Sequence, residues 1–129
     1  MKKQKRAAID QQKIVKAKEI LDKEFRKQIT LEYISRRVGM SPKKLASAFN
    51  DQYYQSIQKY LTMSRALTAM QLLLETKLTI YEIAWETGYG VTRPFSIMFK
   101  KVTGRAPSKW RKIQLSNPPG TVPYIMLTR

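Results

Sequence analysis

The sequence predicts an all-α fold of about seven helices, and three observations support this. Apolar residues recur at helical spacing along most of the 129-residue chain, with capping signals before the apolar stretches. Glycine and proline number only 5 and 6, too few for a β-rich or disordered chain. A two-helix pattern also occurs twice. Its corner glycines, Gly39 and Gly88, lie 49 positions apart, and the apolar residues that follow, Leu45 and Phe95, lie 50 apart.

The first subdomain is predicted over residues 10–55, behind a basic N-terminal arm over 1–9, of which residues 2–6 are expected to fray. From about Asp10 the sequence becomes amphipathic, with its lysines mostly away from one apolar side. That side consists of Ile14, Ala17, Leu21 and Phe25.

Two short helices complete this subdomain. Thr30 is expected to cap a helix over 31–38, which Gly39 ends because glycine takes a positive φ without a Cβ penalty. Ser41 and Pro42 then supply a capping hydroxyl and a proline suited to the first helical turn. The third helix is expected to end near Tyr53 and to bury Leu45, Ala48 and Phe49.

A long linker helix is predicted over residues 56–75, with Ser56 as its cap. Its main apolar stripe is Tyr60, Met63, Leu67, Met70 and Leu74, with Leu61, Leu72 and Leu73 on other faces. A helix that is apolar on several sides must be covered on several sides, so we expect it to be shared by both subdomains. Its length of roughly 30 Å is close to the ~34 Å between successive major grooves on one face of DNA.

The second subdomain is predicted over residues 76–113. Thr79 and Glu82 form a capping box, and Gly88 closes the helix that they open. The next helix starts at about 92–94, with Thr92 as the expected cap before a proline. It directs Phe95, Met98 and Phe99 inward.

A last helix is predicted over 107–113, around a buried Trp110. Beyond it, residues 114–129 contain three prolines and a glycine, so an extended tail is expected. Residues 122–127 are apolar enough to pack back on the body of the protein.

The charge of the chain restricts its possible functions. It has 25 Lys and Arg against 9 Asp and Glu, a formal net charge of +16. This predicts attraction to a polyanion, either nucleic acid or an anionic membrane surface. No stretch reaches the ~18 apolar residues of a membrane span, and no apolar segment follows the basic start as in a secretory signal. We therefore expect a soluble, cytoplasmic protein located on the nucleoid, with no membrane partner.

Catalysis and metal binding are not expected. The chain has no cysteine and no histidine, so it lacks thiolate ligands and the commonest general base. Glu82 and Glu86 are four positions apart, but neither a pocket nor an acid–base partner is visible in the sequence. The prediction is a protein without catalytic residues, metal site or cofactor.

The repeated pattern has the features of a helix-turn-helix, in which one helix crosses the DNA backbone and the next enters the major groove. The outer face of the second helix is then free to contact bases. In the first subdomain that face comprises Lys43, Lys44, Ala46, Ser47 and Asn50. In the second it comprises Thr92, Arg93, Ser96, Ile97 and Lys100.

Several other side chains are candidates for phosphate contact. They are Ser41, Lys59, Arg65, Lys101, Arg105, Lys109 and Arg111. Arg93 begins a recognition helix, so a base contact is the hypothesis there, whereas Lys43 fits a phosphate better. Arg65 has a second interpretation, a structural pair with an acidic residue inside the protein.

At these positions the chain resembles the AraC/XylS family of bacterial transcription regulators, over roughly residues 14–112. The most specific part is a C-terminal signature made of Ile83-Ala84, Gly88-Tyr89, Phe95-Ser96, Phe99-Lys100-Lys101, Gly104, Pro107-Ser108 and Trp110-Arg111. The linker helix also fits, through Arg65, Ala66, Leu72 and Leu73.

The resemblance implies a sequence-specific DNA-binding unit, usually an activator, with two helix-turn-helices joined by a linker helix. It implies base contacts near the start of each recognition helix. The matching positions are Lys43, Ala46 and Ser47 in the first helix, and Thr92, Arg93, Pro94 and Ile97 in the second.

The chain departs from the family pattern at three positions. Pro94 stands where a small polar or aromatic residue is commoner, which fixes the helix start and removes one contact. Tyr54 occupies the position equivalent to Gly104, so a differently built turn is expected there. Gly90 replaces a typical serine, which weakens the expected cap.

The leading hypothesis is a regulator that binds double-stranded DNA as a monomer and reads two adjacent major grooves. A charge-driven, non-specific nucleic-acid-binding protein is the alternative, although the aromatic residues fit helical core positions rather than an RNA-binding sheet. A third possibility is mainly protein interaction, with RNA polymerase or a sensory domain. We expect no room for an effector or dimerisation domain at this length. If the chain is excised from a longer protein, such a domain is missing here.

Overall fold

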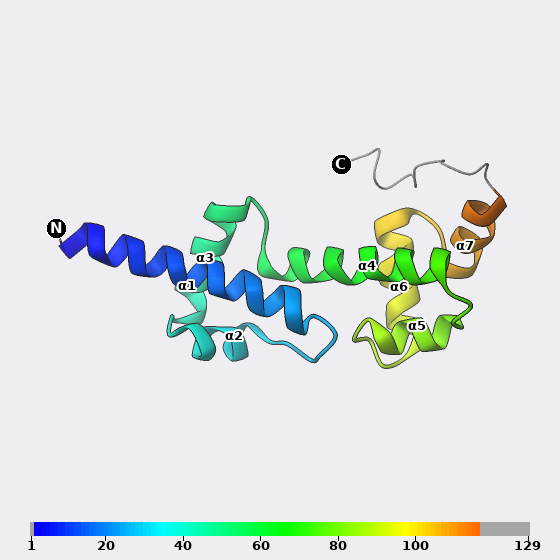
Figure 1. Ribbon diagram of the computed structural model, residues 1–129, viewed down its shortest axis with the longest axis horizontal. Helices are drawn as coiled ribbons and strands as arrows, with labels where there is room; N and C mark the ends of the chain where they lie inside the picture. The colour runs from blue at the N-terminus through cyan, green and yellow to red at the C-terminus, as the bar shows by residue number, and fades with distance from the viewer. Residues whose placement is uncertain (1, 117–129) are drawn as a thin grey trace. The chain divides into compact units, whose positions relative to one another are not determined.

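The computed structural model describes residues 2–116, which form seven helices and no strand (Figure 1). The helices are α1 (Lys2–Glu24), α2 (Leu31–Val38), α3 (Pro42–Tyr53), α4 (Ile57–Glu75), α5 (Ile80–Glu86), α6 (Thr92–Thr103) and α7 (Pro107–Ser116). They divide into two compact units, with the boundary between Leu61 and Thr62. The predicted all-α class is confirmed for the described part of the chain. None of the described helices has an apolar stretch of the length that a membrane span requires.

In the first unit, α1 packs against both α2 and α3, and these two helices contact each other (Figure 1). The core is formed by one buried face from each helix and the start of α4. Its members are Ile14, Ala17, Ile20, Leu21, Ile34, Val38, Met40, Leu45, Phe49, Ile57 and Leu61. The ring centroid of Phe49 lies 4.7 Å from that of Tyr53 and 5.8 Å from that of Tyr60.

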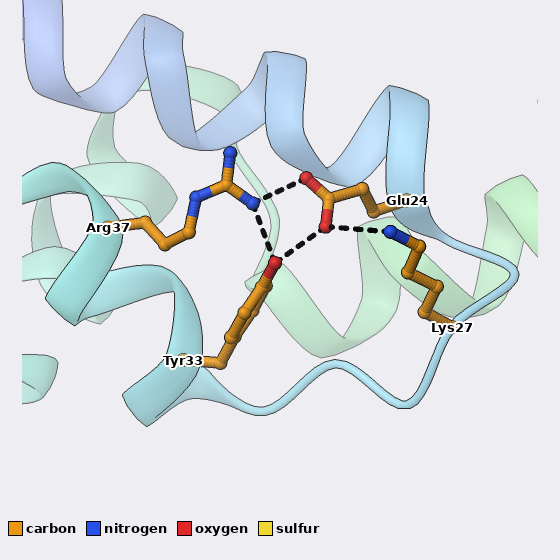
Figure 2. A network of polar contacts seen from close by, with 4 residues as sticks. All are labelled: Glu24, Lys27, Tyr33 and Arg37. Carbon is orange, nitrogen blue, oxygen red and sulfur yellow. Dashed lines mark hydrogen bonds and ion pairs between the residues drawn. The ribbon is translucent and has the colours of Figure 1, made fainter.

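A polar network joins the end of α1 to α2 (Figure 2). The Tyr33 hydroxyl donates to Glu24 Oε1 at 2.6 Å, and Arg37 Nη1 donates to Glu24 Oε2 at 2.6 Å. Lys27 Nζ lies 3.7 Å from the same carboxylate. The hydrogen bond from Tyr33, followed by that from Arg37, lowers the pKa of Glu24 below its ordinary value. The network therefore favours the ionised carboxylate.

In the second unit, α6 packs against α5, which precedes it in the sequence, and against α7, which follows it. Its core consists of Ala66, Ala69, Met70, Leu73, Ile83, Ala84, Phe95, Met98, Phe99 and Trp110. Phe99 is central, with its ring centroid 5.8 Å from Phe95 and 5.4 Å from Trp110. The inward positions predicted for α6 and the burial of Trp110 are confirmed.

The long helix α4 supplies residues to both cores, Ile57 and Leu61 to the first and the stretch from Ala66 to Leu73 to the second. The predicted apolar stripe is partly wrong, because Leu67 is 39% exposed. The face that is buried is rich in small side chains: it contains Ala66, Ala69, Met70 and Leu73. A prediction weighted toward large apolar residues misses such a face, since alanine packs closely without contributing much bulk.

The two ends of the described region differ from the prediction. Residues 2–9, expected as an arm before the first helix and frayed over 2–6, are helical and belong to α1, which begins at Lys2. Lysine, arginine, glutamine and alanine all favour helix, and no glycine or proline interrupts them. At the other end, α7 continues past the predicted limit at 113 to Ser116, whose hydroxyl donates to the carbonyl oxygen of Lys112 at 2.8 Å. The rest of the expected tail, including 122–127, lies outside the described residues.

The turn after α3 is a further correction. Tyr54 adopts the left-handed conformation with φ 58°, and its N–H donates to Asn50 O at 2.8 Å. Gly104 ends α6 in the same way, with φ 87°. The two turns are therefore of the same kind, although tyrosine carries a steric penalty in this conformation that glycine does not.

Candidate nucleic-acid interface

The corner between α2 and α3 is built from local hydrogen bonds. Thr30 caps α2, and Gly39 ends it in the left-handed region with φ 75°. Lys13 Nζ of α1 donates to the Gly39 carbonyl at 3.0 Å. Ser41 Oγ then accepts from the Lys44 N–H at 3.3 Å and opens α3. The predicted caps are confirmed, and Lys13 supports the corner from a helix that the sequence pattern did not connect with it.

The outer face of α3 lies opposite the buried Leu45 and Phe49. Lys43, Lys44, Ser47 and Asn50 are exposed on it, and Ala46 is half-buried. An open cleft of about 410 Å³ runs along this face, lined by Ser41, Lys43, Lys44, Ser47, Ala48 and Asp51. The helix thus brings together the predicted contact residues of the first unit on one accessible surface.

Lys44 has a partner that the sequence did not predict. Its Nζ lies 3.0 Å from Asp10 Oδ2 of α1. The two residues are far apart in the sequence, so no local pattern indicates the contact. Because an anion already neutralises part of this charge, Lys44 is a weaker candidate for a DNA contact than Lys43.

The corner between α5 and α6 begins with the predicted capping box. The Glu82 N–H donates to Thr79 Oγ1 at 3.1 Å, and the Thr79 N–H donates to Glu82 Oε1 at 3.0 Å. Hydrogen bonding of the Glu82 carboxylate to the Thr79 backbone, and then to its side chain, lowers the pKa of Glu82 below its ordinary value. After α5, the buried Thr87 donates its hydroxyl to Ile83 O at 2.8 Å, and Gly88 turns the chain with φ 93°.

The start of α6 differs from the prediction that Thr92 caps it. Val91 is the N-cap residue and makes no side-chain hydrogen bond, while Thr92 is the first residue of the helix. The third residue of the helix is Pro94, which has no N–H to donate to a cap. The first turn of α6 therefore lacks the side-chain cap that opens α2, α3 and α5.

On α6, Arg93, Pro94, Ile97 and Lys100 are exposed, and Thr92 and Ser96 are half-buried. Ile97 is 60% exposed although it is apolar. Phe95, Met98 and Phe99 occupy the opposite, buried face. The structure therefore places the predicted contact residues of the second unit on one side of one helix.

Among the phosphate candidates, five are exposed: Ser41, Lys59, Lys101, Arg105 and Lys109. Arg65 is only 8% exposed, and its guanidinium carbon lies 5.2 Å from the centroid of the Tyr89 ring. Burial raises the pKa of Tyr89, and the nearby Arg65 opposes this shift. Its burial and its contact with an aromatic ring favour the structural interpretation of Arg65 over a phosphate contact.

Arg111 makes hydrogen bonds within the protein that favour a structural role over a phosphate contact. Its Nε donates to Leu73 O at 2.9 Å, its Nη1 to Leu78 O at 2.7 Å and its Nη2 to Thr76 O at 3.1 Å. The side chain thus binds the carbonyls at the end of α4 and in the segment before α5. A cation at the C-terminal end of a helix also interacts favourably with its dipole.

The charges of the two units are distributed differently. In the first unit, ion pairs join Lys18 to Asp22, Arg37 to Glu24 and Lys44 to Asp10. After Glu86 the sequence contains no Asp or Glu at all. The α6 and α7 region is therefore purely basic, which suits a polyanionic partner.

Comparison with known proteins agrees with this geometry. The family described as "Helix-turn-helix domain" matches residues 34–113, more than half of the chain. Together with its relatives, this match shows that the chain belongs to the AraC-type family of helix-turn-helix transcriptional regulators.

Solved structures share the fold. The C-terminal domain of AraT, a response regulator from Geobacillus stearothermophilus, has a TM-score of 0.78 and 31% identity, covering 85% of this chain and 91% of that one. The C-terminal domain of the response regulator yesN from Fusobacterium nucleatum has a TM-score of 0.72 and 30% identity, covering 74% and 93%. The DNA-binding domain of AdpA, solved with a target DNA, has a TM-score of 0.78 over 84% and 97% but 18% identity, so it supports the fold alone.

Curated relatives are much longer than this chain. The transcriptional activator RhaR of Escherichia coli is 34% identical over 73 residues, which are 57% of this chain and 26% of RhaR. The uncharacterised regulator YtdP of Bacillus subtilis is 31% identical over 93 residues, which are 72% of this chain and 12% of YtdP. The chain therefore corresponds to a minor part of these regulators.

Proposed function

We propose that this chain recognises a specific DNA sequence, with α3 and α6 each entering a major groove, and that it regulates transcription from that site. The observation that carries the proposal is the outer face of α6. Arg93 and Lys100 are exposed there beside the apolar Ile97, in a region without any carboxylate. Arginine can read guanine with two hydrogen bonds, and an apolar side chain can contact the thymine methyl group.

The first unit supports the same interpretation with a different chemistry. Lys43 and Ser47 on α3 are exposed and polar, and both line the cleft on that face. They suit phosphate and base contacts, while Lys59 in the same unit, and Lys101, Arg105 and Lys109 in the second unit, suit phosphate contacts. A monomer that uses both helices would prefer an asymmetric site of about two helical turns.

The test compares two variants on two DNAs. The preferred sequence is first selected from a random pool, and affinity is then measured by fluorescence anisotropy on that site and on a scrambled duplex. Arg93→Ala should weaken binding to the selected site by about 1–3 kcal/mol, roughly 5- to 150-fold, and weaken binding to scrambled DNA much less. The matched control Arg105→Ala should weaken both similarly and reduce the salt slope by about one.

If Arg93→Ala affects both DNAs equally, Arg93 contacts phosphate only. If no sequence is enriched from the pool, the chain is a charge-driven, non-specific DNA-binding protein and the proposal is wrong.

The same proposal includes activation, contact with RNA polymerase, location in the cytoplasm and the absence of an enzymatic activity. A promoter–reporter assay with the selected site tests the direction of regulation, and RhaR, named an activator, is the precedent.

A further inference from the structure

The first turns of α1, residues 2–9, form a basic arm that the function proposed above does not use. All eight residues are exposed. Four of them are cations: Lys2, Lys3, Lys5 and Arg6. The arm precedes the first acidic residue of the chain, Asp10, and the first core residue, Ile14, and in Figure 1 it extends beyond α2 and α3. It also lies before residues 34–113, so the family match assigns it no role.

Two contacts attach the next turn of α1 to the helix-turn-helix of the first unit. Asp10 Oδ2 lies 3.0 Å from the Nζ of Lys44, which stands on the outer face of α3. Lys13 Nζ donates to the carbonyl oxygen of Gly39, in the corner before α3, at 3.0 Å. The arm therefore begins directly beside the start of the helix that is proposed to enter a major groove.

Helical spacing places two of the arm's cations on the side of α1 that makes these contacts. Residues four or seven positions apart share one face of a helix. Arg6 is four residues before Asp10 and Lys3 is seven residues before it, so both point to the side of α3. Lys5 and Lys16 are rotated from Asp10 by about 140° and about 120°, at roughly 100° per residue, and they lie on the far side of the same helix.

The charge of this surface selects a polyanion. The Asp10 carboxylate is already paired with Lys44, so it repels an approaching anion less than an unpaired carboxylate would. Each strand of DNA presents a phosphate about every 3.4 Å, and the eight residues of the arm span roughly 12 Å. The arm is thus long enough to reach several phosphates beside a groove that α3 occupies.

We propose that Lys3 and Arg6 contact phosphates that border the major groove entered by α3, which makes α1 a further DNA-contacting element of this chain. Such contacts add affinity and fix the orientation of the unit, but they read no base. The inference rests on the proposed function, because it takes α3 as the helix that enters the groove.

Salt dependence tests the contact against a matched control. The double change Lys3→Gln with Arg6→Gln removes two cations from the side of α3, and Lys5→Gln with Lys16→Gln removes two from the far side. Glutamine favours helix about as strongly as lysine and arginine, and circular dichroism checks that α1 is retained. The first variant should reduce the slope of log affinity against log salt by about two, and the control should leave it nearly unchanged.

Neutral phosphates then locate the contact. Single phosphates of the selected site are replaced by methylphosphonates, one duplex at a time, and the affinity for each duplex is measured. A phosphate that Lys3 or Arg6 contacts should matter for the unchanged chain and no longer matter for the variant. Because the two residues are about one turn apart, Lys3→Gln and Arg6→Gln alone should silence neighbouring phosphates, and the control variant should silence none.

Three results would overturn the inference. Equal salt slopes for the two double variants would mean that only the net charge of α1 matters. Silenced phosphates that are scattered along the site would mean that the arm has no fixed place on the DNA. Unchanged DNA affinity, with binding to anionic lipid vesicles lost in the first variant alone, would assign the arm to a membrane surface. If no DNA sequence is selected, the proposed function fails, while the salt slopes on a random-sequence duplex still test the arm.

Discussion

Removing Arg111 can separate a structural role from a DNA-binding role. Both roles predict weaker DNA binding, but only the structural role predicts lower stability of the fold. Its guanidinium makes three hydrogen bonds to backbone carbonyls, at 2.7–3.1 Å, in a half-buried position. Hydrogen bonds to a charged group contribute about 1.5–3 kcal/mol each. The three bonds share one side chain and water can replace part of them, so we expect Arg111→Ala to lower the free energy of unfolding by about 3 kcal/mol.

The assay is urea unfolding followed by tryptophan fluorescence in a Trp85→Phe background. The remaining Trp110 is 1% exposed and belongs to the core of the second unit, so it reports on the unit that contains Arg111. Arg111→Lys should recover part of the loss, because an ammonium group reaches fewer of the carbonyls. Lys109→Ala, on the exposed side of the same helix, is the control and should leave stability unchanged.

DNA affinity completes this test. At a temperature where Arg111→Ala is folded, the slope of log affinity against log salt should equal that of the unchanged chain. The reasoning is refuted if Arg111→Ala unfolds like the unchanged chain but its salt slope falls by about one, since this is the signature of a lost phosphate contact.

Three more predictions concern stability. Tyr54→Gly should raise the midpoint of thermal unfolding, with a gain of about 1 kcal/mol, because it removes left-handed strain from a side chain that is 91% exposed; an unchanged or lower midpoint contradicts the idea. Thr79→Ala should cost about 1 kcal/mol in urea unfolding, and the capping-box account fails if Thr79→Ser costs as much. The pKa of Glu24 is lowered in the folded state. Its contribution to the stability of the fold is therefore present above the ordinary pKa of 4.5, and it is lost as the pH falls through the lower pKa of the folded state. Glu24→Gln should therefore flatten the decline of stability in acid, and an unchanged pH profile would show that the network is not coupled to folding.

Local signals in the sequence predicted most of the fold. Thr30, Ser41, Ser56 and Thr79 each cap a helix by accepting from the N–H three residues further on. Such a contact depends on a few adjacent residues, so the pattern is visible in the sequence. The same is true of Gly39, because its φ of 75° strongly favours glycine.

The missed features depend on contacts between distant segments. Asp10 pairs with Lys44, and Arg111 binds carbonyls near Leu73, but no spacing rule connects these positions. The outer faces of α3 and α6 could be predicted because exposure follows from helical periodicity. The ion pair of Lys44 on α3 and the burial of Arg65 on α4 could not be predicted in that way.

The uncapped start of α6 leads to a last prediction. The four side-chain caps of the described region all bond to the third residue of their helix, and in α6 that residue is Pro94, which has no N–H. A hydroxyl at position 91 would therefore lack its usual donor. Val91→Ser alone should change stability little, whereas in a Pro94→Ala background it should add about 1 kcal/mol, the usual effect of a capping residue. Urea unfolding of the four proteins in this double-mutant cycle measures the coupling. Equal effects of Val91→Ser in both backgrounds would show that the proline is not the reason why this helix lacks a cap.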